Sequence, residues 1–581
     1  MLMKEKIRDS IKQALNRSGL DFSESDLSGI QIEYPEPQFG DYSTNAALIL
    51  AKRIGKKPAD LAKLIIEKLG DSDYEASIAG PGFINLRIKD GVLSEFLKET
   101  VKKFLGDKKK KSKDKILVEY FQPNIAKPLH IGHLRTAIIG DCIKRLLFYT
   151  GHHAESETHM GDWGTQFGFL ILAYKKYGDR DSIEKDPINE LNKLYIQINN
   201  EAEMDATIRE AAKAEFVKLE QGDQENRKIW KLFVDWSMEK FLKIEHFLDI
   251  LPFDHHWPES FYEDKMPAVL KKLKDKGLLL ESQGAQIVDL ENQGLGIAII
   301  VKSDGATTYL LRDLATFIHR KQQGFTKQLY VVDTRQSHTL AQTYAILKLM
   351  GEMEENEAVH LNYGFVSFKG SVLSTRKGNL VLAEEVLDEA KQRITKIIKD
   401  KNPDLNKKDE AIEVIAKGAV KYFDLKHNRH SDFEFDWEEA LDFQGNSGPY
   451  LQYTYTRLAS ILRNASVVIP DSDPESKTMK LDSRFRGNDK AIITETERRI
   501  MVELIKFNEV VDTSLKDYLP NILANYLHHL AGLLNRFYHE SPVISETDKD
   551  VKNNRLVLVD SAAKILAKGL DLLGIKVLEE M

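Results

Sequence analysis

The feature that most constrains the fold is a strand, a loop and a helix start between residues 116 and 151. Residues 116–121 form an apolar run, which predicts a buried strand. A polar loop follows, apolar residues then recur at helical spacing over 134–149, and Gly151 stands where a helix commonly ends. This arrangement suits a nucleotide, because the free N–H groups and the dipole of a helix N-terminus favour phosphate oxygens.

Two histidines stand at the junction of this loop and helix. His130 and His133 are separated by two residues, so both imidazoles can point the same way and donate hydrogen bonds to a phosphate whose charge builds up in a transition state. Gly132 lets a flat ring such as adenine lie against the backbone. The competing interpretation is a helix-capping loop with incidental histidines. The strand–loop–helix frame, with Asn124 and Lys127 nearby, favours the nucleotide site.

Residues 123–135 resemble the HIGH region of class I aminoacyl-tRNA synthetases, in the form found in arginyl-tRNA synthetases. The resemblance implies catalytic roles for His130, His133 and Lys127. It implies that ATP is bound by Pro123, Asn124, Ile125, Ala126, Lys127, Pro128, Leu129, His130, Ile131, Gly132 and His133.

Length and composition set bounds on the rest of the chain. A chain of 581 residues is expected to contain about three or four domains. It has no apolar stretch long enough to span a bilayer, and its first residues lack the apolar core of a secretory signal, so we expect no membrane partner. The single cysteine, Cys142, fits a reducing cytoplasm and argues against a structural zinc site. The net charge of −7 neither predicts nor excludes nucleic-acid binding, which depends on local patches.

The predicted fold class is multidomain α/β, with a Rossmann-like nucleotide-binding catalytic domain, an N-terminal α+β accessory domain and a C-terminal α-helical bundle. The strings at 40–45 and 79–85 resemble the N-terminal domain peculiar to arginyl-tRNA synthetases, which implies a tRNA-contacting role. The lysine-rich stretch at 107–115 is expected to be a solvated linker, and the alternative is a patch that contacts phosphates. The expected divisions are an N-terminal domain at 1–106, the basic linker at 107–115, the catalytic domain at 116–380 with a helical insertion at about 185–250, a helical connecting region at 381–445, and an anticodon-binding bundle at 446–581.

Polar residues in four further segments suggest a pocket for arginine. The segments are the glycine-rich loop at 157–168, Pro258–Tyr262, 303–313 and the end of the apolar strand at 330–336. A guanidinium group requires carboxylates that accept its planar fork and neutral acceptors for its remaining N–H groups, which a lysine would leave unpaired. By resemblance, the arginine-binding residues are Asn124 at the α-amino or carboxylate end, His159, the carboxylates of Glu259 and Asp313, Tyr309 and Gln336. The alternative for Asp313 is a salt bridge with Arg312.

The second signature of class I enzymes should follow the sheet. Its counterpart is the stretch at 372–376, which lacks both lysines of the usual motif, as arginyl-tRNA synthetases often do. The candidates for the positive charge on the ATP phosphates are Lys127, Arg376 and Lys377.

The C-terminal region predicts a helix bundle, at about 449–464, 494–514, 518–540 and 556–573. Tyr450, Tyr453 and Arg457 share one helix and offer surface for stacking unpaired tRNA bases, although tyrosines at helical spacing are more often part of a core. The stretch at about 471–490 is polar and turn-rich and is interpreted as an inserted loop. Its deletion should leave melting temperature and aminoacylation almost unchanged.

The sequence therefore predicts a cytoplasmic arginine–tRNA ligase that uses ATP with Mg²⁺, acts on L-arginine and tRNA(Arg), and is a monomer. By resemblance, arginine activation should need bound tRNA. One alternative is another ligase with a HIGH motif, such as a cysteinyl type, which the lack of zinc-ligand cysteines opposes. A second is a non-catalytic tRNA-binding protein descended from a synthetase. No metal site is expected, and His255 and His256 are assigned to a surface turn.

Overall fold

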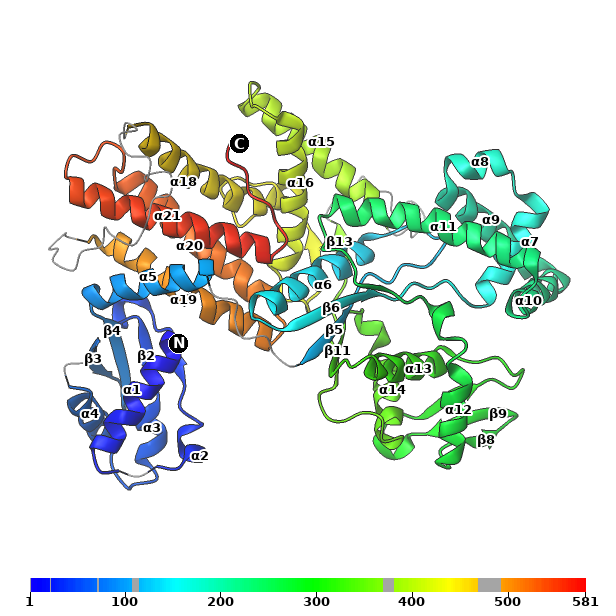
Figure 1. The fold of residues 1–581 in the computed structure, drawn as a ribbon, viewed down its shortest axis with the longest axis horizontal. Helices are drawn as coiled ribbons and strands as arrows, with labels where there is room; N and C mark the ends of the chain where they lie inside the picture. Colours follow the sequence, from blue (N-terminus) through cyan, green and yellow to red (C-terminus); the bar gives the residue numbers. More distant parts are fainter. Residues whose placement is uncertain (1, 21, 71–72, 107–113, 369–380, 469–492) are drawn as a thin grey trace.

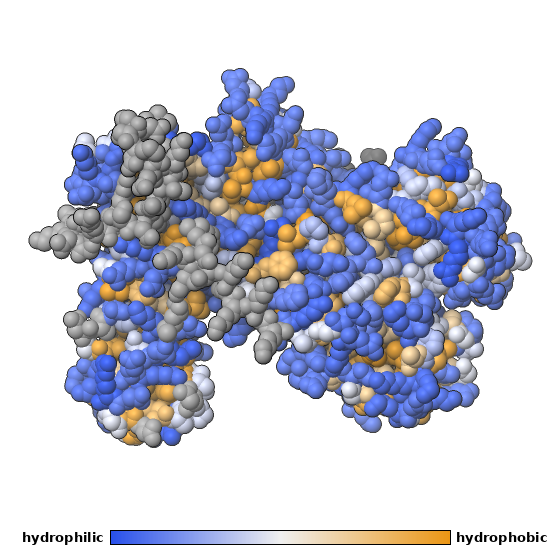
Figure 2. All heavy atoms as spheres, viewed as in Figure 1, coloured by the Kyte–Doolittle hydropathy of each residue, from blue (hydrophilic) through white to orange (hydrophobic). Residues whose placement is uncertain are grey.

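The structure, a computed structural model, describes residues 2–20, 22–70, 73–106, 114–368, 381–468 and 493–581. An N-terminal module, a catalytic α/β domain with two insertions and a C-terminal helix bundle follow one another along the chain (Figure 1). Among the described residues, no helix is long and apolar enough to cross a membrane. Hydrophilic residues cover most of the face seen in Figure 2.

The N-terminal module packs helices on an antiparallel sheet with the strand order β1-β2-β4-β3. Burial of Ile7, Ile11 and Leu15 explains the helical spacing of its first helix, and Pro58 occupies the first turn of α4, where its missing N–H costs little. Its elements are α1 (Met3–Arg17), α2 (Glu24–Leu27), β1 (Ile32–Glu33), η1 (Pro37–Phe39), β2 (Tyr42–Thr44), α3 (Ala46–Ala51), α4 (Pro58–Leu69), β3 (Tyr74–Ala79), β4 (Phe83–Ile88) and α5 (Asp90–Gly106).

The catalytic domain is built on a parallel sheet with the strand order β12-β11-β5-β6-β7. Its middle strand, β5, is buried on both sides, as its apolar run predicts. Its elements are β5 (Lys115–Glu119), α6 (Ile131–Tyr149), β6 (His153–Thr158), α7 (Thr165–Tyr177), β7 (His255–His256), η2 (Glu259–Tyr262), α13 (Tyr309–Gln322), β11 (Lys327–Tyr330), η4 (Thr334–Gln336), α14 (Ser337–Leu349), β12 (Ala358–His360) and β13 (Val366–Phe368).

Two insertions interrupt this sheet and lie on one side of the molecule in Figure 1. The first is helical, as predicted for about 185–250, and it follows β6. The second carries an antiparallel sheet, β10-β9-β8, which the sequence interpretation missed. Their elements are α8 (Arg180–Lys185), α9 (Pro187–Met204), α10 (Ala206–Glu220), α11 (Gln224–Phe247), α12 (Met266–Asp275), β8 (Leu280–Ser282), β9 (Ala285–Asp289), η3 (Glu291–Gln293) and β10 (Ile297–Val301).

The sequence prediction of a surface turn at His255 and His256 is wrong. The two residues form β7, which pairs in parallel with Glu157 and Thr158 of β6. Nε2 of His255 donates a hydrogen bond to the Glu155 carboxylate at 2.6 Å. A strand of two residues is too short to leave a period in the sequence. Within the described ranges, no group of three His, Cys, Asp or Glu residues is placed to hold a metal ion.

The C-terminal region is helical, and the prediction of a bundle is confirmed. The predicted inserted loop at 471–490 lies outside the described residues. The elements are α15 (Ala383–Lys401), α16 (Lys408–Leu425), β14 (Phe433–Phe435), α17 (Trp437–Ala440), α18 (Gly448–Val468), α19 (Glu495–Lys516), α20 (Pro520–Glu540) and α21 (Lys549–Leu572).

The N-terminal module is docked on this bundle through helix α19. Arg498 of α19 donates from Nη1 and Nη2 to the two carboxylate oxygens of Asp41, at 2.9 and 2.8 Å, and from Nε to Asp90 at 2.9 Å. Asp41 and Arg498 are both buried. The hydroxyl of Tyr42 donates to Glu509 of the same helix at 3.3 Å. The Gly-Asp-Tyr string that marked this module therefore makes contacts between domains.

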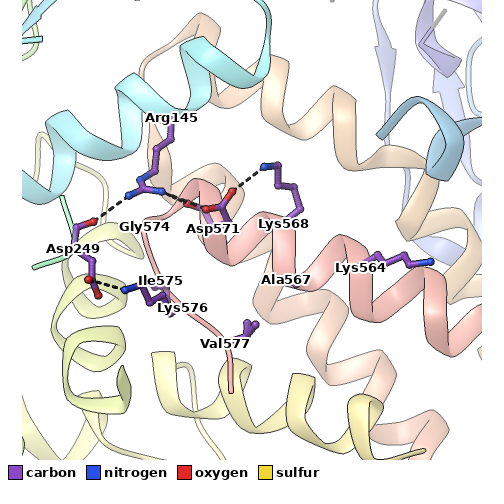
Figure 3. A pocket seen from close by; sticks show the side chains of 10 residues that line it. All are labelled: Arg145, Asp249, Lys564, Ala567, Lys568, Asp571, Gly574, Ile575, Lys576 and Val577. Carbon is purple, nitrogen blue, oxygen red and sulfur yellow. Dashed lines mark hydrogen bonds and ion pairs between the residues drawn. The ribbon is translucent and has the colours of Figure 1, made fainter. Parts of the chain in front are cut away.

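The bundle also meets helix α6, at a hollow of about 670 Å³ (Figure 3). Gly574, with a φ of 70°, follows α21 and its carbonyl accepts a hydrogen bond at 2.6 Å from Lys421 of α16. Every cation that lines the hollow has a carboxylate partner: Arg145 pairs with Asp141 and Asp571, Lys564 with Asp560, Lys568 with Asp571 and Lys576 with Asp249. The hollow therefore lies between α6 and the C-terminal segment, and the positive charges of its lining are neutralised by carboxylates.

Candidate active site

The candidate site lies where the strand order of the parallel sheet reverses. β5 and β11 are neighbours, yet the chain leaves β5 toward β6 and reaches β11 only after β7. Ligands of open α/β sheets bind at such a switch point, beyond the carboxyl ends of the strands. The hydroxyl of Thr136 in α6 donates to the carbonyl of Val331 at 2.7 Å, which ties the helix to the end of β11.

The loop after β5 is held by contacts to two other segments. Ala126 has a φ of 61°, and its amide donates to Oγ of Ser237 in α11 at 2.9 Å. Asn124 forms a parallel bridge with Gly161, at which a Cβ would collide with Oδ1 of Asn124. The Asn124 side chain thus lies against the backbone of the glycine-rich loop, and the two sequence motifs meet.

Backbone amides fix the tautomers of the two histidines. His130 caps α6, and the Gly132 amide donates to its Nδ1 at 3.1 Å. The His130 amide donates to Nδ1 of His133, also at 3.1 Å. The ring centroids are 3.9 Å apart. Because each Nδ1 accepts a hydrogen bond, each neutral ring carries its proton on Nε2, where it can be donated to a ligand.

Both rings are kept neutral by their surroundings. Burial, together with the neighbouring His130, lowers the pKa of His133 to about 3. Burial and the charge of Arg335 lower the pKa of His130, and Asp333 opposes that change. At neutral pH the pair therefore offers hydrogen bonds without a net charge.

The chain beyond the second signature contacts this histidine turn. The Ile131 amide donates to the Val381 carbonyl at 3.0 Å, and the Ala383 amide donates to the Leu129 carbonyl at 2.9 Å. Arg376 and Lys377 lie outside the described residues.

Two described cations lie beside the loop and the histidines. Lys127 is half-buried, with Nζ 5.3 Å from the ring centroid of Tyr195, and burial lowers the pKa of Lys127. Arg335 follows β11, where it pairs with Asp333 at 2.6 Å, and its charge acts on His130. The sequence interpretation missed Arg335, although its place just beyond a strand end was a usable signal.

The residues predicted to bind arginine stand beyond the carboxyl edge of the sheet. His159 follows β6, Glu259 opens η2, Tyr309 and Asp313 are in the first turns of α13, and Gln336 ends η4. Tyr309 and Gln336 are exposed. Glu259 accepts a hydrogen bond at 3.3 Å from Arg312, which also donates to Glu263 at 3.0 Å. Arg312 thus pairs with these two glutamates and not with Asp313, the pairing that the sequence left open.

Asp313 differs from the other carboxylates of the site. Within the part of the chain that the structure describes, it has no hydrogen-bond or ion-pair partner. Burial and the charges of Glu119 and Glu259 raise the pKa of Asp313 to about 7, while His159 and Arg312 oppose the rise. These mutual effects place Glu119, His159 and Glu259 around Asp313.

A buried ionic cluster beneath these residues escaped the sequence interpretation. Arg320 of α13 pairs with Glu157 in β6 at 2.7 Å and with Glu119 at the end of β5 at 2.6 Å. Burial acts to lower the pKa of His159, but a hydrogen bond to Glu157 and the charges of Glu119 and Glu157 raise it overall. Glutamates within apolar strand sequences were the available signal, because charged residues are rarely buried without a partner.

Comparisons with known proteins agree with this geometry. Residues 93–437 match the catalytic domain of class I tRNA synthetases (R), residues 451–581 match the DALR anticodon binding domain, and residues 5–88 match the arginyl-tRNA synthetase N-terminal domain. The arginine–tRNA ligase of Halothermothrix orenii is 36% identical over 589 residues, which cover 100% of this chain and 99% of that protein. That of Clostridium kluyveri is 36% identical over 97% of this chain and 98% of its own. The chain belongs to the arginyl-tRNA synthetase family.

Solved structures show the same fold. The arginyl-tRNA synthetase of Thermus thermophilus superposes with a TM-score of 0.80 at 26% identity, and each chain is covered completely. That of Plasmodium falciparum gives a TM-score of 0.78 at 24% identity, covering 100% of this chain and 99% of its own, and supports the fold alone.

Thr158 stands directly before His159 in the glycine-rich loop. The Thr158 hydroxyl is buried and donates to the Phe121 carbonyl at 2.6 Å. Phe121 has a φ of 59°. Thr158 therefore supports the bend that ends β5.

The three residues predicted to contact tRNA line one hollow of about 490 Å³ in the C-terminal bundle. The guanidinium carbon of Arg457 is 4.5 Å from the Tyr453 ring centroid, and Nη1 donates to Asn535 at 2.6 Å. Tyr450 partly packs on the core and lies 5.5 Å from the His528 ring. Tyr453 and Arg457 thus offer a preformed aromatic and cationic wall.

Proposed function

We propose that this chain is an arginine–tRNA ligase that joins L-arginine to ATP, releases pyrophosphate, and transfers arginine from the adenylate to the 3′ end of tRNA(Arg). Membership of the class I family supports the reaction type. The observation that carries the proposal is the neutral His130–His133 donor pair at the switch point of the sheet, whose carboxyl edge also holds Glu259 and Asp313.

Arginine is recognised through its guanidinium fork. Asp313 supplies the unpaired carboxylate, and Glu259 with Tyr309 forms the neighbouring wall. Asn124 and His159 meet the α-amino and carboxylate end, and Gln336 closes the pocket from the η4 side. A lysine would leave carboxylate acceptors unpaired, which is the physical basis of discrimination.

ATP lies over the turn that begins α6. The Nε2 protons of His130 and His133 bind the phosphate where charge develops, and Gly132 lets adenine approach the backbone. Lys127, Arg376 and Lys377 supply positive charge in place of the missing signature lysines. Mg²⁺ enters with ATP as part of the substrate. The attack of the arginine carboxylate on the α-phosphorus is in line, so the enzyme contributes positioning and charge stabilisation.

The tRNA spans the molecule, with its 3′ end at the sheet and an unpaired base in the hollow of the bundle. Tyr453 and Arg457 favour stacking of a base, since every base has a face for aromatic and guanidinium groups.

The decisive experiment measures arginine charging of purified tRNA, with pyrophosphate exchange run with and without that tRNA. Charging by the monomer fraction of a gel-filtration run, with tRNA-dependent exchange, supports the whole proposal. Binding of tRNA without charging of any amino acid would favour the non-catalytic protein instead.

A further inference from the structure

The centre of the buried cluster is a guanidinium group that belongs to the protein. Arg320 is fully buried, as is Glu157, and Glu119 is nearly so. Nε of Arg320 is 2.7 Å from one oxygen of Glu157, and Nη2 donates to the other at 2.8 Å. The same Nη2 lies 2.6 Å from Glu119. Arg320 therefore contacts both oxygens of Glu157, one by a hydrogen bond and the other by an ion pair, and the single nitrogen of an ammonium could not occupy both places.

Both carboxylates of the cluster also contact residues of the histidine loop or of the groups proposed to bind arginine. Glu119 also accepts a hydrogen bond at 3.2 Å from Gln122, in the loop that carries the histidines. Glu157 accepts one at 3.3 Å from the Tyr262 hydroxyl and lies 3.5 Å from Nδ1 of His159. Arg320 itself follows Asp313 on the same helix by two turns. The cluster thus connects β5, β6 and α13 immediately beneath the groups that receive the substrate.

Stability alone is a weak reason for this arrangement. Taking three charges out of water is costly, and apolar side chains of similar volume often stabilise a core equally well. A fixed internal guanidinium has a second effect, because it neutralises two carboxylates and sets their directions before the substrate arrives.

We propose that Arg320 is a positioning residue for arginine specificity, which orients Glu119 directly and His159 through Glu157. The inference rests on the proposed arginine–tRNA ligase activity and adds a residue that does not itself touch the substrate. Loss of the planar guanidinium frees Glu157 and weakens its contact to His159, so arginine binding suffers while ATP binding at the histidine turn does not.

The test compares Arg320→Lys with wild type in the charging reaction, with arginine and ATP varied separately. The variant keeps the charge but loses the fork. We expect KM for arginine to rise about tenfold or more, with KM for ATP changed less than about threefold, because small displacements of positioned groups cost large factors.

A matched control is available in the C-terminal bundle. Arg555 also holds two carboxylates, Glu497 at 2.6 Å and Glu546 at 2.9 Å, and is mostly buried. Arg555→Lys should leave KM for arginine unchanged. A rise equal to that of Arg320→Lys would show a general folding effect and overturn the proposal.

A second variant keeps the proposal testable if Arg320→Lys folds poorly. Arg320→Met with Glu157→Gln removes one positive and one negative charge together, so the net charge of the cluster is unchanged. It should show the same selective rise for arginine, and a KM for arginine within twofold of wild type in either folded variant would refute the positioning role. Wild-type protein that fails to charge tRNA would instead refute the proposed function.

Discussion

At the scale of single residues, the proposed role of the two histidines as neutral donors follows from their Nδ1 atoms, each of which accepts a backbone hydrogen bond. His133→Ala removes one Nε2 donor from the phosphate, so we expect kcat to fall about 10²- to 10³-fold with little change in KM for arginine. His133→Asn, which keeps an N–H donor, should retain more activity. Steady-state charging measures both variants, and wild-type turnover by His133→Ala would remove the residue from the mechanism.

The pH profile offers a separate check on the same pair. The pKa of His133 is lowered to about 3, and burial also lowers that of His130. Neither ring should add an inflection to kcat above about pH 6.5, the ordinary pKa of a histidine. An inflection that disappears in His133→Ala would show that the ring titrates and would contradict the neutral-donor assignment.

The ionised side chain of Asp313 should lower the stability of the protein when no arginine is bound. Burial raises its folded pKa to about 7, above the unfolded value of about 3.9, so the folded state disfavours the ionised group. The cost is complete above pH 7 and diminishes as the pH falls toward 4. Asp313→Asn should therefore raise Tm by a few degrees at pH 8 and by less at pH 5, while arginine binding is lost. Calorimetry at the two pH values measures the change in Tm. A Tm of Asp313→Asn below that of wild type at pH 8 would contradict the prediction.

Wild-type arginine binding should follow the same titration. A guanidinium needs the ionised carboxylate, so KM for arginine should rise as the pH falls below about 7.

The sequence singled out the histidines, the loop around them and Asp313 as candidates, because these residues lie in short contiguous motifs. It could not locate the partners of Glu119 and Glu157. Arg320 is distant in sequence and meets them only when α13 packs on the sheet. It also left the pairing of Arg312 open, which depends on where η2 places Glu259 and Glu263.

At the scale of elements, α6 approaches β5 closely because Gly140 has no side chain. A Cβ at Gly140 would overlap the fully buried Tyr120 ring. Alanine gains about 1 kcal/mol of helix propensity, but overpacking a core costs about 1–3 kcal/mol, so Gly140→Ala should destabilise the catalytic domain. Thermal unfolding of the variant measures the effect.

The matched control for Gly140→Ala is Gly532→Ala in α20. Gly532 is exposed, and among the described residues nothing beyond its own stretch of helix lies within 4 Å of where a Cβ would stand. This change should stabilise the protein by about 0.5–1 kcal/mol. Equal effects of the two substitutions would show that helix propensity, and not close packing, decides at Gly140.

Long periodic elements were predictable and their ends were not. Helices such as α1 and α4 follow from apolar stripes and a Pro in the first turn. The predicted strand at 116–121 ends at Glu119, because Phe121 bends with a positive φ that Thr158 supports from β6. Helix α7 begins at Thr165, inside the glycine-rich loop at 157–168. Tertiary contacts set these ends, and a local sequence window does not contain them.

At the scale of the whole molecule, the segment after α21 joins the two functional regions. Lys421 holds the Gly574 carbonyl beside α6, and Gln452 and Thr456 of α18 donate to the carbonyls of Lys576 and Leu578, each at 2.8 Å. α18 also carries Tyr453 and Arg457. The helix that begins at the histidines and the helix that lines the proposed base hollow are thus held by one short stretch of chain.

The Arg498–Asp41 pair fixes the N-terminal module to the same bundle, so removing this pair should weaken the attachment of the module. Arg498→Met leaves Asp41 buried without its partner, so the module should detach and unfold at a lower temperature. In a double-mutant cycle with Asp41→Asn, we expect a coupling energy of about 1–3 kcal/mol. KM for tRNA should rise while KM for arginine stays the same, because the pair is remote from the parallel sheet.

Arg87→Met is the control, since Arg87 pairs with Glu495 across the same interface at 3.4 Å but is 40% exposed, and such pairs contribute about 0–1 kcal/mol. Unchanged melting of Arg498→Met would mean that apolar contacts of α1 and α5 with α19 hold the module without this pair.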